Sequence, residues 1–132
     1  MSALLHLTAV HLLPASEISE EMTDAQIIEA AGAKVRERHT PGSATLSTSQ
    51  KPTVSGPVYQ SEISWSVPKM LTEADSNRLL ETGAILIRTM QWQDILIYRN
   101  DVFQNTRLRP SFENTPLRSQ ITFGITTIKP LF

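Results

Sequence analysis

Residues 58–67 alternate strictly between two kinds of side chain, and this pattern constrains the fold more than any other feature of the chain. Successive side chains of a β-strand point to opposite faces, so strict alternation is typical of a sheet with one face on a core and the other in water. Pro68 ends the pattern, because proline cannot continue the hydrogen-bond ladder of a central strand. The sequence therefore predicts a long strand with an inward face made of Tyr59, Ser61, Ile63, Trp65 and Val67.

Several other segments have the composition of strands, because they are rich in β-branched and aromatic residues and are bounded by turn residues. Pro110 interrupts a weak segment and places it at a sheet edge, whereas Gly124 within the last segment predicts a β-bulge or a close backbone approach. Residues 51–56 are expected to be a loop. The further predicted strands are residues 3–13, 33–39, 44–49, 84–90, 94–99, 106–112 and 118–128.

Two short helices are predicted from their start and stop residues. Thr23 and Gln26 have the Thr-x-x-Gln form of a capping box, so we expect a helix over residues 24–31, although an apolar pair within it is equally compatible with a strand. Thr72 can cap a second helix over residues 73–82, where acidic residues in the first turn suit the positive end of the helix dipole. A glycine follows each segment, as is typical of helix ends.

The composition is that of one globular domain over residues 1–132, with 40% hydrophobic and 19% charged residues. Short, hairpin-like connections predict an α+β domain, mainly antiparallel β, with a sandwich-like or barrel-like sheet of about seven or eight strands and one or two short helices. The formal net charge of -1 gives no preference for nucleic acid or an anionic membrane, so neither is an expected partner. The absence of cysteine excludes disulfides, thiolate catalysis and Cys-ligated metals.

The chain contains no motif that carries catalytic chemistry: no nucleophile elbow, no zinc-binding His-Glu-x-x-His, no phosphate loop and no dinucleotide glycine pattern. Its acidic residues lie mostly at predicted caps, turns and connectors. His6 and His11 are an odd number of positions apart on a predicted strand, so we expect them to face opposite sides and not to share a metal. The sequence therefore predicts a protein that is not an enzyme and has no catalytic residue, cofactor or metal.

Trp92 stands apart from the other aromatic residues, because it lies at the polar tip of a predicted hairpin, between Gln91 and Gln93. An exposed tryptophan at such a tip is a candidate for a protein interface, where aromatic residues and arginine are enriched. Alternatively, Trp92 folds back over its own hairpin. For Trp65 and Tyr59, on the inward face of the long strand, core packing is the expected role.

A wider pattern extends from the long strand to the end of the chain. It comprises Gly56-Pro57-Val58-Tyr59, Val67-Pro68-Lys69, residues 85–87 and 95–99, Leu108-Arg109-Pro110, residues 121–127 and Pro130-Leu131-Phe132. These residues resemble the pattern of small β-rich structural proteins of tailed bacteriophages and prophages, found in the tail or neck. Asn100-Asp101 stands where that pattern has a glycine-rich turn.

The resemblance implies a virion component, a tail or neck (head-to-tail) subunit that is assembled in the host cytoplasm from contacts with copies of itself or with other virion proteins. The apolar segment 3–13 would either add to a neighbour's sheet or form an ordinary internal strand. An alternative class is a host-encoded, β-rich binding module for a protein or carbohydrate. The candidate interface residues are Trp92, Leu5, Leu7, Arg107 and Arg109.

Overall fold

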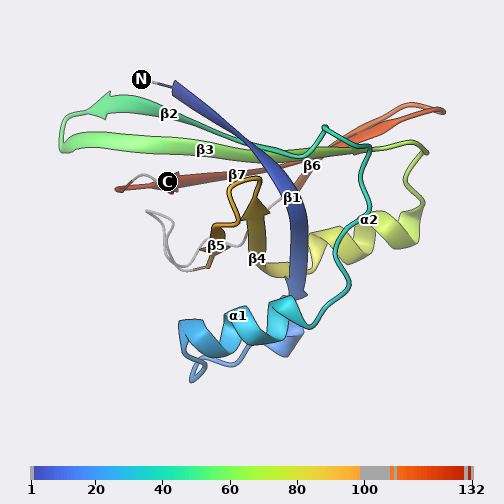
Figure 1. The fold of residues 1–132 in the computed structure, drawn as a ribbon, viewed down its shortest axis with the longest axis horizontal. Helices are drawn as coiled ribbons and strands as arrows, with labels where there is room; N and C mark the ends of the chain where they lie inside the picture. The colour runs from blue at the N-terminus through green and yellow to red at the C-terminus, as the bar shows by residue number, and fades with distance from the viewer. Residues whose placement is uncertain (1, 99–107, 109, 130, 132) are drawn as a thin grey trace.

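The computed structural model describes residues 2–98, 108, 110–129 and 131. Within these residues the chain forms a seven-stranded antiparallel sheet in the order β5-β4-β1-β2-β3-β7-β6, which curls into a half-barrel (Figure 1). The predicted fold class, mainly antiparallel α+β, is confirmed. The strands are β1 (Ser2–Pro14), β2 (Thr45–Thr53), β3 (Gly56–Val67), β4 (Thr82–Thr89), β5 (Asp94–Ile97), β6 (Pro110–Asn114) and β7 (Ser119–Thr127). The helical segments are η1 (Ala15–Glu17), α1 (Asp24–Gly32) and α2 (Glu73–Leu80).

β1 holds the two halves of the sheet together. Its first half pairs with β2, with Leu5 opposite Leu46, whereas its second half pairs with β4, with Val10 opposite Ile87. In Figure 1 this strand crosses steeply between the long strands above and the β4–β5 pair below. The predicted strand at residues 3–13 is thus an internal strand of its own sheet.

A β-bulge at Thr8 marks the point where β1 changes partners. The register against β4 shifts between Leu7 and Ala9, so Thr8 is an extra residue without a partner in the ladder. One extra residue reverses the face on which later side chains lie. Leu5 and Leu7 contact the core before the bulge, and Val10 contacts the same core after it.

The bulge overturns the prediction for the two N-terminal histidines. His6 and His11 both lie on the outer face of the sheet, because the extra residue between them cancels the odd spacing. His6 is exposed, and Nδ1 of His11 lies 2.9 Å from the carbonyl oxygen of Lys34. Among the described residues, no three His, Asp or Glu side chains lie close enough together to hold a metal ion.

The main core fills the concave side of the curled sheet. Trp65 of β3 and Phe123 of β7 stack at its centre, with ring centroids 5.8 Å apart, and both are almost completely buried. Full burial of one such apolar side chain contributes roughly 1.5–3 kcal/mol. Leu79 of α2 closes one side of this core, and the core packing predicted for Trp65 is confirmed, whereas Tyr59 is half-buried.

A second, smaller core lies on the outer face, where α1 packs across β1 and β4 (Figure 1). Ile27 and Ala31 of α1 are completely buried there against Leu13 and Ala84. Both predicted helices are confirmed, and each begins with a capping box, at Thr23 and at Thr72. α2 ends at Leu80, two residues earlier than expected. No helix in the described part of the chain is long and apolar enough to cross a membrane.

Two predicted elements differ from the structure. Residues 33–39 are an irregular connector and not a strand. The N–H of Glu37 donates to the carbonyl of Val10 in β1, whereas the N–H of Thr40, just after the segment, donates to the carbonyl of Ser66 in β3. The connector therefore does not run along a single strand. Residues 51–56, predicted as a loop, instead continue the β2–β3 hairpin, which turns at residues 54–55.

The two strand glycines also have different roles from those predicted. Gly124 pairs regularly with Glu62, and a Cβ at this position would meet no atom within 4 Å, so the expected bulge or close approach is wrong. The close approach occurs instead at Gly83 in β4. A Cβ there would lie 2.6 Å from Cα of Ala15 and 2.9 Å from Cδ1 of Ile18.

We therefore expect Gly83→Ala to lower the free energy of unfolding by about 1–3 kcal/mol, because the added methyl overpacks the contact with η1. Gly124→Ala is the matched control, since it adds the same methyl group to a strand at a position with open space around it. This variant should be as stable as the wild type or more stable by about 0.5–1 kcal/mol. Denaturant unfolding of both variants measures the difference. Equal effects would contradict the packing assigned to Gly83.

Asp75 at the start of α2 predicts a pH dependence of stability. The backbone N–H and the hydroxyl of Thr72 donate to its carboxylate at 3.3 and 3.0 Å, and with Lys69 they hold the pKa of Asp75 below its usual value of 3.8. A carboxyl group whose pKa is lowered by folding stabilises the fold above its unfolded pKa, and this contribution is lost as the pH falls through the folded pKa.

Asp75→Asn should therefore lower the free energy of unfolding by roughly 0.5–1 kcal/mol at neutral pH. This difference from the wild type should shrink as the pH falls below about 4. Urea unfolding of the two proteins across this range provides the measurement. A difference that is independent of pH would show that the charge of Asp75 does not stabilise the helix.

Candidate functional site

The β2–β3 hairpin extends beyond the rest of the sheet, at the left of Figure 1. β1 pairs with β2 only as far as Ser49, and β7 pairs with β3 only from Tyr59 onward. Among the residues that the structure describes, no strand pairs with either edge of residues 51–58, which we call the arm. Three cross-strand pairs make up the arm: Lys51 with Val58, Pro52 with Pro57, and Thr53 with Gly56.

The first strand and the turn of the arm are exposed, whereas Gly56 and Val58 are partly buried. All side chains from 51 to 55 are exposed, and Val54 at the tip is fully exposed. Lys51 is the one charged residue of the arm. An isolated two-stranded hairpin is at best marginally stable in water. A nearly neutral hairpin with this much exposed surface and no described strand at its edges therefore depends for its stability on the sheet at its base.

Two features give the arm a defined shape. At its base, Thr48 and Ser61 share a buried hydrogen bond of 2.9 Å, which anchors the hairpin to the core. At its tip, the hydroxyl of Thr53 donates to the carbonyl of Gly56, whose φ of 117° favours glycine.

The edges of the arm are protected against strand pairing. Pro52 and Pro57 lie opposite each other, and neither has a backbone N–H to offer to another strand. Proline is one of the residues with which natural proteins block exposed sheet edges. The accessible groups of the arm are therefore its exposed side chains and the tip at Val54, more than its backbone edges.

The predicted interface residue Trp92 lies in the β4–β5 turn, with 76% of its surface exposed. Its φ is 63°, in the left-handed region that large side chains rarely adopt. Thr89 stabilises this turn, because its hydroxyl accepts hydrogen bonds from the backbone N–H of Gln91 and of Gln93 at 3.3 and 3.2 Å. The indole also lies 5.8 Å from the guanidinium carbon of Arg88. Trp92 thus contacts Arg88 of its own hairpin, and most of its side chain is still exposed.

Two of the other predicted interface residues, Leu5 and Leu7, pack into the main core. Leu7 is 2% exposed and belongs to the main core, and Leu5 is partly buried against the same core. Both side chains therefore stabilise their own chain. Arg107 and Arg109 lie outside the described residues. The sequence alone does not reveal the arm, because Pro52 and Gly56 are typical of loops, although proline is also common in edge strands.

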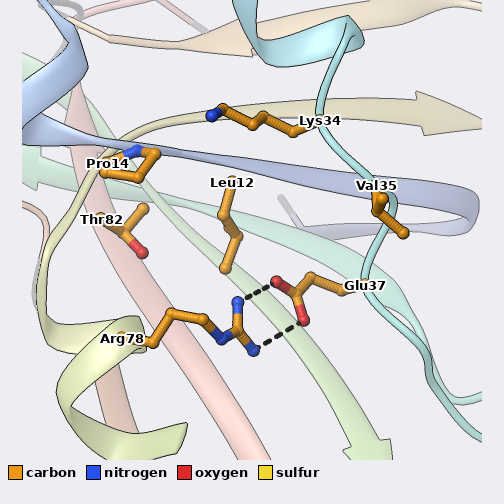
Figure 2. A pocket seen from close by; sticks show the side chains of 7 residues that line it. All are labelled: Leu12, Pro14, Lys34, Val35, Glu37, Arg78 and Thr82. Carbon is orange, nitrogen blue, oxygen red and sulfur yellow. Dashed lines mark hydrogen bonds and ion pairs between the residues drawn. The ribbon is translucent and has the colours of Figure 1, made fainter. Parts of the chain in front are cut away.

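The connector between α1 and β2 borders a small hollow of about 170 Å³ (Figure 2). There the guanidinium of Arg78 donates to both carboxylate oxygens of Glu37, at 2.5 and 3.1 Å, which raises the pKa of Arg78. Lys34, on the same connector, pairs with Glu17 at 2.6 Å. Each charged side chain of this hollow therefore already has a partner, and the two ion pairs fix the connector to η1 and to α2.

Comparison with protein-family models, with curated proteins and with solved structures gave no match to this chain. The surfaces described above are therefore interpreted from their own geometry.

Because the backbone of Trp92 is left-handed, two substitutions that both remove the indole should differ in their effect on stability. Trp92→Gly should be more stable than Trp92→Ala by about 1 kcal/mol, because glycine adopts a positive φ without the cost that a Cβ imposes. Thermal unfolding of the two variants gives the comparison, and each serves as the control for the other. Equal stability would show that the turn relaxes to a different backbone conformation.

Proposed function

We propose that this chain is a structural subunit that assembles through protein–protein contacts, as a tail or neck component of a phage particle. The observation that carries the proposal is the arm, residues 51–58, which projects from the sheet with no described strand beside either edge and with the side chains of residues 51–55 exposed. An exposed hairpin of this kind fits a subunit whose neighbour in an assembly completes its surroundings. The partners in this proposal are copies of the same chain or other virion proteins.

The surface chemistry of the arm supports a protein partner. The cores of protein interfaces are depleted of charged residues, and the arm carries one charge, on Lys51. Tyr59 lies half-buried at its base, with Gln50 as its cross-strand partner. The arm therefore offers neutral polar and apolar groups that a neighbouring subunit can cover without burying unpaired charges.

An open backbone edge near the base of the arm offers a second point of contact. Residues 2–5 of β1 pair with β2 on one side, and no described strand pairs with them on the other side. Leu4 is exposed beside this edge. A strand from a neighbouring subunit can add here by main-chain hydrogen bonds, next to a hairpin whose own edges are blocked by proline.

The proposal predicts that the arm is required for assembly but not for folding. Replacing residues 51–58 by Asn-Gly joins Gln50 to Tyr59, which are already paired, through a two-residue turn suited to a hairpin. We expect the shortened chain to unfold with unchanged cooperativity and to remain a monomer. The wild type should form larger species as its concentration rises, and light scattering coupled to size exclusion measures the mass of both proteins.

A pair of single substitutions provides a sharper test. Val54→Asp places a charge at the tip of the arm, and Val35→Asp places the same charge at an equally exposed valine on the connector. The first should weaken self-association about tenfold or more, and the second should leave it unchanged. Equal effects would contradict a role of the arm. A wild-type chain that stays monomeric at every concentration would rule out the self-assembling subunit and favour the binding module.

A further inference from the structure

A second surface lies on the outer face of the sheet, away from the arm. It is a hollow of about 330 Å³ between β1, β4, the end of α1 and the connector. Leu86 forms part of its wall, and three nitrogen-bearing side chains and one carboxylate border it: His11, Arg36, Arg88 and Asp94. The volume falls at the lower end of the range for small-molecule pockets.

The guanidinium of Arg88 is held in place before any ligand binds. Its Nε and Nη2 donate to the two carboxylate oxygens of Asp94 at 2.9 and 3.4 Å, and the indole of Trp92 lies against it. The pairing with Asp94 also raises the pKa of Arg88. The remaining nitrogen, Nη1, makes no hydrogen bond with any described residue, so it is free to donate to a ligand. Such prior positioning lowers the entropic cost of binding.

Arg36 provides a second guanidinium, on the connector side of the hollow. It forms no hydrogen bond or ion pair with the described part of the chain, in contrast to Lys34 and Glu37 on the same connector. The backbone around it is fixed, because the N–H of Glu37 donates to the carbonyl of Val10 at 2.8 Å. Arg36 is thus a cation on a fixed backbone, without a partner among the described residues.

His11 adds a polar atom to the same hollow. A carbonyl oxygen can only accept, so the contact of Nδ1 with the carbonyl of Lys34 places a proton on Nδ1. The other ring nitrogen, Nε2, has no partner among the described residues. The hollow therefore contains two guanidinium groups and one carboxylate, an excess of one positive charge before the imidazole is counted.

We propose that this hollow binds the oxyanion group, carboxylate or phosphate, of a small molecule. Guanidinium groups bind such planar or tetrahedral oxyanions through paired, charge-assisted hydrogen bonds. In this arrangement Arg36 and Nη1 of Arg88 donate to the ligand, and Asp94 and Trp92 keep Arg88 in position. The site is independent of the arm, so it does not rest on the proposed assembly.

The test is titration of the full chain with inorganic phosphate and with citrate, followed by the backbone amide NMR signals. We expect saturable shifts of residues that line the hollow, including His11 and Arg36. Phosphate and citrate differ in size and geometry, so the anion that binds more tightly shows whether the site prefers a phosphate or a carboxylate group. No saturable shift with either anion up to about 20 mM would overturn the proposal.

Two variants distinguish specific binding of the anion in the hollow from its general attraction to the positively charged connector. Arg36→Ala removes a guanidinium from the hollow, whereas Arg38→Ala removes the same charge from an exposed position two residues further along, outside the residues that line it. The first should weaken binding about tenfold and the second less than about twofold. Arg88→Lys keeps the charge but loses the fork geometry, and it should weaken binding severalfold. Equal losses in the two alanine variants would overturn the proposal.

Discussion

The partner switch of β1 is the constraint on which the rest of the structure depends. Residues 2–6 pair with β2 and residues from Leu7 onward pair with β4, so one strand belongs to both halves of the sheet. The extra residue at Thr8 bends the strand and sharpens its twist, which turns the two halves toward each other. Leu7 and Val10, on either side of the bulge, then point into the same core, where Trp65 and Phe123 stack. Without this extra residue, Val10 and Leu12 would lie on the outer face of the sheet and not in the main core.

The same pairing determines where the arm begins. β1 leaves β2 unpaired beyond Ser49, and β7 leaves β3 unpaired before Tyr59, so the hairpin continues alone from that point. The core ends there too, because the last buried polar pair is Thr48 with Ser61. The arm is thus an extension of a well-packed sheet and not a separate flexible element. Its direction is set by strands that are buried on their inner face.

Local features could be predicted from the sequence, and features that depend on distant pairing could not. The alternation at residues 58–67 and the capping residues Thr23 and Thr72 act within one element. Both capping boxes form as expected, and burial alternates along β3 from Gln60 to Trp65, whereas Ser66 is buried. The bulge at Thr8 depends on the register against β4, some eighty residues away, so nothing near it in the sequence signals it. The arm depends on the absence of neighbouring strands, which no local pattern records. Arg36 and Arg88 are likewise brought to one hollow only by the packing of the connector over β4.

The hollow on the outer face of the sheet and the arm are two separate surfaces of the same sheet. α1 covers Leu13 and Ala84 at the lower end of β1 and β4, and the hollow with Arg36 and Arg88 begins where the helix ends. The arm is instead at the turn end of the long β2–β3 hairpin (Figure 1). Since no residue of the arm borders the hollow, a substitution at either surface should act there alone, as expected for sites without shared contacts. The proposed anion site is therefore separable from the proposed assembly, because the hollow and the arm share no residue and the ion pair of Glu37 with Arg78 holds the connector in place.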